Sequence, residues 1–297
     1  MRWAEGFIAV DWGTTNRRAY RVAAEGALAD EREDDRGILA VGKGGFEAAV
    51  TQIRERLGYL PLLMGGMVGS NRGWVEAPYA PCPAGLPELA QRLQWVEPGR
   101  IAIVPGVAWD SGDAADVMRG EEVQILGAFG EGLIAADSIV CHPGTHNKWI
   151  RVEDGRITSF RTVMTGELFS LLKAHSILSD LLAGPADTGP AFEAGVRRGL
   201  ACDDLTAELF SVRARVLLGK AAREEAASYV SGLLIGTDLR IGLRFAGDGE
   251  GEIVVMARPE LSRLFAAGLA VAGRSARELD GETAFLAGAR HIAELLQ

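Results

Sequence analysis

One short pattern occurs twice in this chain, 131 residues apart, and it constrains the fold more than any other feature. IAVDWGTTNRRAY spans residues 8–20, and IVCHPGTHNKWIR spans residues 139–151. In both, an apolar run predicts a strand, Gly-Thr predicts a turn, and a second run predicts another strand. An acidic-Gly pair follows, at Glu25-Gly26 and, after a two-residue slip, at Asp154-Gly155. Coincidence is the alternative, but the shared setting favours a duplicated strand–turn–strand unit.

Composition limits the class of protein. The chain has 297 residues, 48% of them hydrophobic and 24% charged, which is enough apolar material for two packed domains and excludes general disorder. The net charge of −9 argues against a nucleic-acid partner. Its three cysteines include no CxxC pair, and its longest late apolar stretch is about half of a membrane span. We expect a cytoplasmic protein with no membrane partner.

The repeat and the hydrophobic pattern predict an α/β chain of two domains, 1–133 and 134–297. Helical spacing predicts helices at 45–57, 116–129, 165–182, 189–201, 203–220, 222–246, 259–272 and 283–296. Short apolar or alternating runs predict strands at 7–10, 17–22, 27–33, 101–107 and 252–257. The stretch 61–70 predicts a buried strand that runs into a glycine-rich loop, and 139–151 predicts the strand–turn–strand unit of the second copy. The Pro- and Gly-rich stretch 72–85 predicts an ordered surface loop.

The Gly-Thr turns are candidate phosphate-binding sites. A tight turn after a strand presents successive main-chain N–H groups and hydroxyls at one point, and glycine permits close approach. Two such turns, one in each domain, could hold a polyphosphate across a cleft. Asp11 ends the first strand, and a carboxylate beside phosphate needs an intervening cation, so we expect Mg²⁺ bound through water. The alternative is a plain hairpin in which Asp11 caps its own turn.

Six segments carry a resemblance to a known family. They are AVDWGTTNRRA (9–19), MGGMVGSNRGWVEAPYAPCPAG (64–85), MRGEEVQILGA (118–128), HPGTHNKWI (142–150), MTGELF (164–169) and LLIGTDLR (233–240). Together they resemble the 2-dehydro-3-deoxygalactonokinases, which belong to the sugar kinase, Hsp70 and actin superfamily. The resemblance spans nearly the whole chain, and its long GWVEAPY segment is the most specific part.

The resemblance implies a fold and a reaction. The fold is two ribonuclease-H-like (actin-like ATPase) domains, each a mixed sheet flanked by helices, with a cleft between them. The reaction is ATP-dependent, Mg²⁺-assisted phosphorylation of the terminal hydroxyl of 2-dehydro-3-deoxy-D-galactonate to the 6-phosphate, in galactonate or galactose catabolism. The phosphate contacts are then expected from Gly13, Thr14, Thr15, Gly144, Thr145 and Lys148.

The resemblance also places a catalytic base. RGEEVQILGA resembles the Gly-Asp-Gln-Gln-Ala segment of carbohydrate kinases, and Glu121 stands at the position of the catalytic acid. A carboxylate there accepts the proton of the attacking hydroxyl. Glu122 is the neighbouring alternative, and Glu167 and Asp113 are further candidates. Another interpretation is that Glu121 and Glu122 are ordinary acids of the first helical turn, stabilised by the positive end of the helix dipole.

The chain departs from the superfamily in two places. An acidic residue usually precedes the second Gly, but here the sequence is Cys141-His142-Pro143, so the metal is expected to depend on Asp11 alone. The adenosine motif is degenerate, because 254–265 contains little glycine, and no adenine contact is placed. His142 and His146 form no metal site by spacing. His146 or Lys148 could instead contact phosphate.

An acidic substrate needs basic or amide partners. The candidates for substrate binding are Arg18, Gly66, Ser70, Arg72, Trp74, Thr165 and Glu167. Arg18 could serve substrate or phosphate, and Trp74 could form an apolar wall for the sugar chain. N–H groups at the start of the helix after Thr165 could hold oxygens. The alternatives are a solvated charge for Arg72 and a simple N-cap for Thr165.

Other functions on the same fold remain open at this point. They are a kinase for another sugar or sugar acid, a polyphosphatase-like enzyme, and a non-enzymatic nucleotide switch. The net charge of −9 speaks weakly against a polyphosphate channel. The sequence does not separate the C4 epimers of the keto-deoxy acid. It does not reveal the oligomeric state either, for which a homodimer is only the commonest default.

Overall fold

The computed structural model describes residues 3–247, 249 and 251–296. These residues fold into two compact units. The first takes those within 1–137, 152–159 and 281–297, and the second those within 138–151 and 160–280. The expected domains, 1–133 and 134–297, stay a prediction. The C-terminal segment 281–297 and the short segment 152–159, which contains the Asp154-Gly155 turn, belong to the first unit.

The first unit is built on a six-stranded sheet with the strand order β3-β2-β1-β4-β7-β6. Its strands are β1 (Phe7–Trp12), β2 (Arg17–Val22), β3 (Leu28–Asp34), β4 (Leu62–Gly66), β6 (Gln94–Glu97) and β7 (Ile101–Ile103). β1 pairs antiparallel with β2 and parallel with β4, so the sheet is mixed. The first repeat copy therefore forms the expected three-stranded meander.

The second repeat copy forms the same arrangement. A five-stranded sheet has the order β12-β11-β10-β13-β14. Its strands are β10 (Ser138–His142), β11 (Asn147–Glu153), β12 (Arg156–Val163), β13 (Ile253–Met256) and β14 (Ala276–Leu279). β10 pairs parallel with β13, as β1 does with β4. The matching strand orders confirm the expectation of two mixed sheets of ribonuclease-H-like topology.

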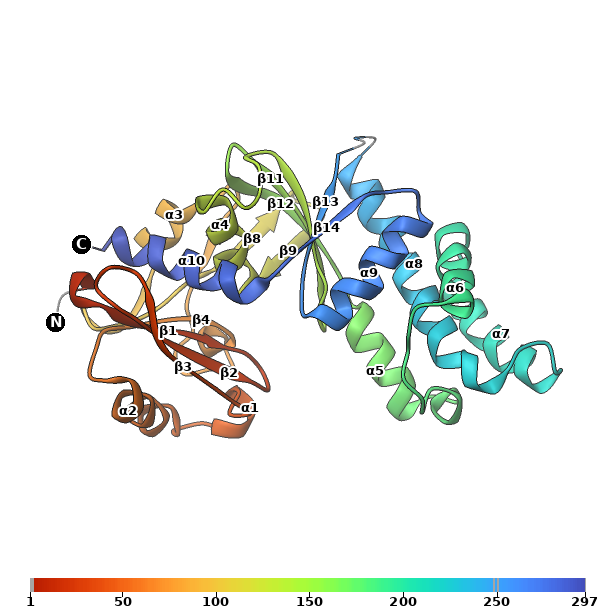
Figure 1. Ribbon diagram of the computed structural model, residues 1–297, viewed down its shortest axis with the longest axis horizontal. Helices are drawn as coiled ribbons and strands as arrows, with labels where there is room; N and C mark the ends of the chain where they lie inside the picture. Colours follow the sequence, from red (N-terminus) through yellow and green to blue (C-terminus); the bar gives the residue numbers. More distant parts are fainter. Residues whose placement is uncertain (1–2, 248, 250, 297) are drawn as a thin grey trace. The chain divides into compact units, whose positions relative to one another are not determined.

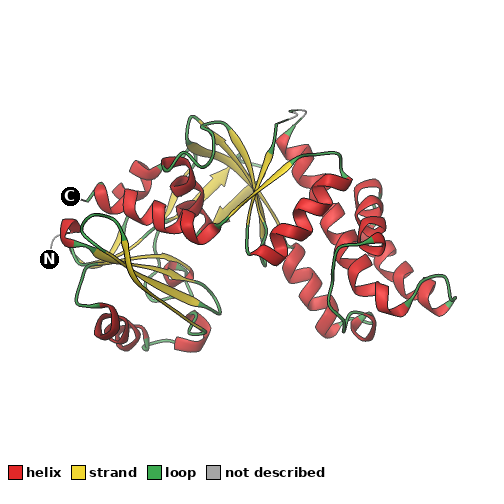
Figure 2. Ribbon diagram, viewed as in Figure 1, coloured by secondary structure: helices red, strands yellow, loops and turns green. Residues whose placement is uncertain are grey.

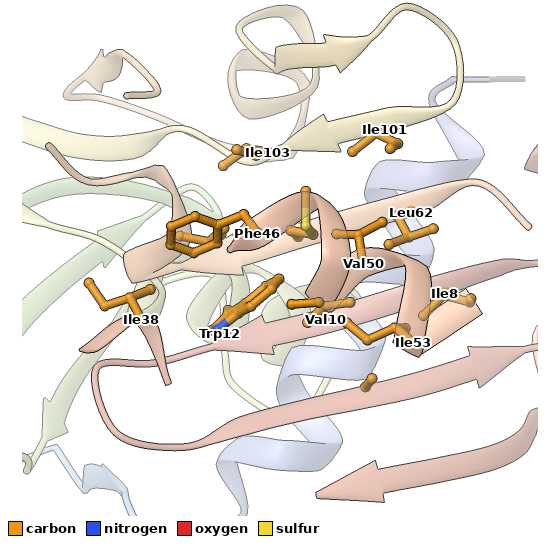
Figure 3. Close-up of a cluster of buried hydrophobic side chains, with 14 of the residues drawn as sticks. Ile8, Val10, Trp12, Ile38, Phe46, Val50, Ile53, Leu62, Ile101 and Ile103 are labelled. Carbon is orange, nitrogen blue, oxygen red and sulfur yellow. The ribbon is translucent and has the colours of Figure 1, made fainter. Parts of the chain in front are cut away.

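Alternation along β1 gives its sheet two buried faces. Ile8, Val10 and Trp12 point into an apolar cluster formed with helix α2 (Phe46–Leu57), as Figure 3 shows. The rings of Trp12 and Phe46 lie 5.5 Å apart between centroids. Burying one such side chain stabilises the fold by roughly 1.5–3 kcal/mol. This cluster supports the end of β1, where the first turn begins.

The opposite face of this sheet packs on helix α10 (Gly281–Glu294), the last helix of the chain (Figure 1). The rings of Tyr20 and Phe285 lie 6.2 Å apart, and Arg18 forms an ion pair with Glu282 at 2.7 Å. Within the same unit, α10 also crosses helix α4 (Glu121–Gly130) closely. A Cβ on Gly127 would lie 2.1 Å from the carbonyl oxygen of Ala284.

The structure corrects two expectations in this unit. Residues 115–118 are not helical but form β9 (Ala115–Met118), which pairs antiparallel with β8 (Gly106–Asp110). The helix begins only at Glu121, because Gly120 has a φ of 110° and breaks the regular backbone. The predicted loop contains a further strand, β5 (Tyr79–Pro81), parallel to β8. The remaining helices are α1 (Ile38–Val41) and α3 (Leu86–Gln91).

The second unit is rich in helices, drawn red in Figure 2. They are α5 (Thr165–His175), α6 (Pro190–Ala201), α7 (Leu205–Leu217), α8 (Ala226–Ala246) and α9 (Pro259–Val271). The predicted helix at 165–182 ends at His175, and a short 3₁₀ turn at Ser179–Leu181 follows. Helices α6 and α8 cross at glycines: a Cβ on Gly232 would lie 2.1 Å from the Phe192 carbonyl oxygen.

Among the described residues, no helix is both long enough and apolar enough to span a bilayer.

Candidate phosphate-binding turns and active site

The first Gly-Thr turn connects β1 to β2, and its carbonyl oxygens are already used. The N–H of Gly13 donates to the carbonyl of Asn16 at 2.9 Å, which closes the turn. Main-chain N–H groups of residues 37–39 donate to the carbonyls of Gly13, Thr14 and Thr15 at 2.8–3.3 Å. The side chains of Thr14 and Thr15 are exposed. The carbonyls of the turn therefore face residues 37–39. A turn whose carbonyls are bound on one side can present its N–H groups to an anion on the opposite side.

The second turn, between β10 and β11, also has hydrogen bonds within the turn and to a later segment, but a side chain closes it. The N–H of Gly144 donates to Oδ1 of Asn147 at 2.8 Å. The N–H of Glu167, in the first turn of α5, donates to the carbonyl of Thr145 at 2.9 Å. Thr145 is exposed, as Thr14 and Thr15 are. The start of α5 thus donates to the second turn as residues 37–39 donate to the first.

Two glycines make this support possible. A Cβ on Gly37 would lie 2.3 Å from the carbonyl oxygen of Thr14, and a Cβ on Gly166 would lie 2.3 Å from that of Gly144. Real Cβ atoms do not approach oxygen so closely, so each position requires glycine. Gly37 and Gly166 are 129 residues apart, the same spacing as the two acidic-Gly turns. The duplication therefore extends beyond the segments that first indicated it.

Asp11 lies where three segments of the first unit meet. It pairs in register with Gly65 of β4, and the next residue, Gly66, has a φ of 86°. A Cβ on Gly66 would lie 3.5 Å from Oδ1 of Asp11 and 2.9 Å from the carbonyl oxygen of Trp12. A Cβ on Gly120 would lie 3.3 Å from the α-carbon of Gly66. The structure therefore brings Asp11, Gly66 and the start of α4 together.

The two acids at the start of α4 differ in environment. Glu122 is fully buried, and the N–H of Gly120 donates to both of its carboxylate oxygens at 2.9 and 2.7 Å. Burial, with a smaller contribution from the charge of Glu121, raises the pKa of Glu122 to about 8. Glu121 is half-buried, and its Oε2 accepts from the N–H of Arg119 at 3.1 Å. Glu121 is therefore the acid with solvent access.

The loop after β4 lies beside this helix start. Nη2 of Arg119 donates to the carbonyl of Ala77 at 2.8 Å, which ties the loop to the segment before α4. The hydroxyl of Ser70 donates to the carbonyl of Met67 at 2.8 Å, so Ser70 shapes the loop. Trp74 is half-buried and stacks on Phe46 with 6.3 Å between ring centroids. Arg72 is exposed at the loop surface.

The other predicted site residues have structural partners. Arg18 forms ion pairs with Glu33 at 3.0 Å and Glu282 at 2.7 Å, so its guanidinium is engaged by two carboxylates. Lys148 is buried, and its Nζ donates to the carbonyl of His146 at 3.3 Å. Their assignments to substrate or phosphate stay predictions.

The residues at the start of α5 also have partners. Nε2 of His146 lies 2.5 Å from Oε2 of Glu167. The buried hydroxyl of Thr165 donates to Asp238 and does not cap the helix, whose N-cap is Met164. The structure therefore differs from the simple N-cap alternative. The roles of Thr165 and Glu167 in substrate binding stay predictions.

Asp238, on α8, is a residue that the site assignment from sequence missed. It is fully buried and accepts from Nδ2 of Asn147 and Nε1 of Trp149, each at 2.7 Å, and from the hydroxyl of Thr165. Burial raises its pKa, and the three donors oppose that rise. An acid within an apolar helix needs buried partners, and this was the available sequence signal.

An apolar cavity of about 130 Å³ lies beside the second turn. Apart from turn and helix-start residues, its lining is mostly aliphatic and aromatic. The lining residues are Gly144, Asn147, Thr165, Gly166, Phe169, Ala186, Ser231, Leu234, Ile235, Leu261, Leu264 and Phe265. Such a surface fits a flat, weakly polar group better than a phosphate.

Metal binding depends on few groups here. Within the described part of the chain, no group of three or more His, Cys, Asp or Glu side chains could hold an ion. Mg²⁺ usually keeps several of its coordinated waters, so one or two protein carboxylates are enough to bind it. A Cβ on Gly66 would lie 3.5 Å from Oδ1 of Asp11, so glycine at this position places no side chain against the carboxylate that would hold a hydrated ion.

The fold has known relatives. Component A of the (R)-2-hydroxyglutaryl-CoA dehydratase of Acidaminococcus fermentans superposes with a TM-score of 0.52, covering 98% of each chain at 13% identity, which shows the fold alone. The strand order, the duplicated turns and this similarity define an actin-like ATPase fold. With the match described next, they place the chain among the carbohydrate kinases of that fold.

The chain belongs to the 2-keto-3-deoxy-galactonokinase family, whose model matches residues 11–292. A 2-dehydro-3-deoxygalactonokinase of Escherichia coli (strain K12) is 36% identical over 97% of both chains. The crystal structure of a candidate 2-dehydro-3-deoxygalactonokinase from Sinorhizobium meliloti has a TM-score of 0.90, with 35% identity over 97% of this chain and 98% of that one. The expected family is confirmed.

Proposed function

We propose that this chain transfers the γ-phosphoryl group of ATP to the terminal hydroxyl of 2-dehydro-3-deoxy-D-galactonate, giving the 6-phosphate, in the cytoplasm. The family match over nearly the whole chain supports the reaction. The observation that carries the proposal is the pair of turns: a later segment donates to the carbonyls of residues 13–15 in the first and to the carbonyl of Thr145 in the second, and Thr14, Thr15 and Thr145 are exposed. No specific observation favours a polyphosphatase or a nucleotide switch.

In this proposal each turn binds phosphate oxygens of the nucleotide. The N–H groups and hydroxyls of residues 13–15 supply one set of donors, and those of Gly144 and Thr145 supply the other. Neutral donors fixed before the nucleotide arrives suit an acidic protein, because they bind phosphate without a large basic surface. The apolar cavity beside the second turn suits the nucleobase. Buried Lys148 adds a positive charge behind that turn.

Asp11 would hold Mg²⁺ through coordinated water. When bound, the ion neutralises charge on the phosphate oxygens during transfer. Asp11 stands at the end of a buried strand, so its carboxylate is held by the sheet and not by a loop. Gly66 places no side chain against this carboxylate, and Gly120 places none against Gly66.

Glu121 would accept the proton of the attacking hydroxyl. It has solvent access, whereas both oxygens of buried Glu122 are taken by the N–H of Gly120. General-base help is worth about 10²–10⁴ in rate, and the remainder comes from positioning and charge stabilisation. The exposed guanidinium of Arg72 would pair with the substrate carboxylate, and Trp74 would line the sugar chain.

Product analysis tests this proposal. The purified protein is incubated with Mg-ATP and 2-dehydro-3-deoxy-D-galactonate, and the product is analysed by phosphorus and proton NMR. We expect one phosphomonoester coupled to the protons on C6. A phosphate on another carbon, or inorganic phosphate alone, would contradict the proposal.

A further inference from the structure

We propose that Asp238 is a positioning residue that fixes the orientation of the Asn147 amide and, through it, the second Gly-Thr turn. It thereby controls the affinity for ATP without touching the nucleotide. This inference rests on the proposed function, in which that turn binds phosphate oxygens.

Two consecutive hydrogen bonds, called the relay below, connect Asp238 to the second turn through Asn147. Oδ2 of Asp238 accepts from Nδ2 of Asn147 at 2.7 Å, and Oδ1 of Asn147 accepts from the N–H of Gly144 at 2.8 Å. Asp238, Asn147 and Trp149 are each at most 1% exposed. With water excluded, each donor and acceptor depends on its protein partner. The relay runs from α8 to the first residue of the turn.

The chemistry of the carboxylate sets the direction of this relay. An ionised carboxylate only accepts, so Asn147 must present its NH₂ group to Asp238. The amide oxygen then faces Gly144, where it accepts the turn N–H. A flipped amide would set oxygen against carboxylate and NH₂ against N–H, leaving two buried pairs unsatisfied. Asp238 therefore determines which atom of Asn147 supports the turn.

The same carboxylate also holds the segment that packs on the turn. The hydroxyl of Thr165, the first residue of α5, donates to Oδ2 of Asp238. The N–H of Glu167, two residues further, donates to the carbonyl of Thr145. The turn and the helix start are therefore both tied to one point on α8.

The first turn closes differently. The N–H of Gly13 donates to the main-chain carbonyl of Asn16, which no side-chain flip can alter. The corresponding residue of the second copy, Asn147, uses its side chain instead. The dependence on a distant acid is therefore specific to the second turn, and it explains a buried charge in an apolar helix.

Exchanging the two side chains tests the direction of the relay. In Asp238→Asn, one carbonyl oxygen replaces two carboxylate oxygens, so Asn147 and Trp149 no longer both have an acceptor and the amide of Asn147 is no longer held in one orientation. We expect the affinity for ATP, measured by calorimetry, to fall about tenfold or more. The KM for ATP should rise similarly, while the KM for the sugar acid stays within about twofold. The double variant Asp238→Asn with Asn147→Asp keeps the net charge. It restores an acceptor for Gly144 and should recover most of the affinity.

Trp149→Phe is the matched control, because Nε1 of Trp149 donates to the other oxygen of Asp238, whereas the relay to Gly144 runs through Asn147. It should lower the melting temperature but leave ATP affinity within about twofold of wild type. If Asp238→Asn fails to fold, recovery of folding and ATP binding in the double variant still supports the relay.

Two results overturn the inference. One is unchanged ATP affinity in Asp238→Asn. The other is a double variant no better than the worse single variant, with Asn147→Asp measured alongside. Failure of the wild-type protein to bind ATP would instead overturn the proposed function itself, and calorimetry on wild type separates these cases.

Discussion

The N–H of Gly144 donates to the side-chain oxygen of Asn147 at 2.8 Å, and this bond closes the second Gly-Thr turn. The equivalent bond in the first turn ends on a main-chain carbonyl. Two copies of one local sequence thus reach the same turn by different means. The difference is the basis for the proposal that the second turn depends on α8.

The glycines that support the turns give the first prediction. Gly166→Ala places a Cβ 2.3 Å from a carbonyl oxygen, and Gly37→Ala does the same at the first turn. Relieving either contact must shift a turn, so we expect a loss of about 1–3 kcal/mol in unfolding free energy and a higher KM for ATP. Gly184→Ala is the control, since nothing lies within 4 Å of its Cβ position. Wild-type KM in both test variants would contradict this account.

Glu121→Gln should lower kcat by about 10²–10⁴ with little change in the KM for ATP, because the substitution removes a proton acceptor and keeps the shape. Steady-state kinetics measure this. Glu47→Gln changes an exposed acid in the first turn of α2 and should have no effect. Full activity in Glu121→Gln would show that another acid is the catalytic base, and Glu122 would then be tested first.

Burial of Glu122 predicts a pH dependence of stability. The pKa of Glu122 is about 8 in the folded protein against an ordinary value of 4.5, so the folded state holds a proton that the unfolded state releases between these values. The contribution of Glu122 to unfolding free energy therefore falls as pH rises from about 4.5 to 8. Denaturant unfolding at several pH values measures this. As pH rises from about 4.5 to 8, the unfolding free energy of the Glu122→Gln variant should increase relative to that of wild type. A difference independent of pH would contradict the prediction.

Asp11→Asn should raise the Mg²⁺ concentration needed for half-maximal activity, because the neutral amide attracts the hydrated ion less strongly. Titration of initial rate against Mg²⁺ at saturating ATP measures this. Glu47→Gln, at an exposed position on α2, is the control and should leave the Mg²⁺ curve unchanged. A coincident curve for Asp11→Asn would remove Asp11 from the metal site.

The local parts of the fold could be predicted from the sequence. The repeat indicated both meanders, and most helices lie within a few residues of their predicted bounds. The prediction failed at 116–118, which belong to β9, because Gly120 interrupts what looked like one helical pattern over 116–129. The packing of the last helix under β2, through Phe285 and Tyr20, also left no trace in local sequence. Contacts between residues far apart in the chain have no periodic signature.

The same limit applied to the candidate site. Gly-Thr turns are local, and their chemistry followed from a few neighbouring residues. Asp238 is 91 residues from Asn147, and its role became visible only when the helix and the turn were placed together. Gly37 and Gly166 likewise looked unremarkable until their contacts with the turns were known.

The most direct test of the central claim is an initial-rate comparison of sugar acids by coupled ADP release with Mg-ATP. The panel contains 2-dehydro-3-deoxy-D-galactonate, its C4 epimer derived from gluconate, and neutral hexoses. We predict the highest kcat/KM for the galactonate-derived acid and little ADP release with the neutral sugars. Turnover of neutral sugars alone would contradict the sugar-acid assignment, and ADP release without any acceptor would contradict the kinase itself.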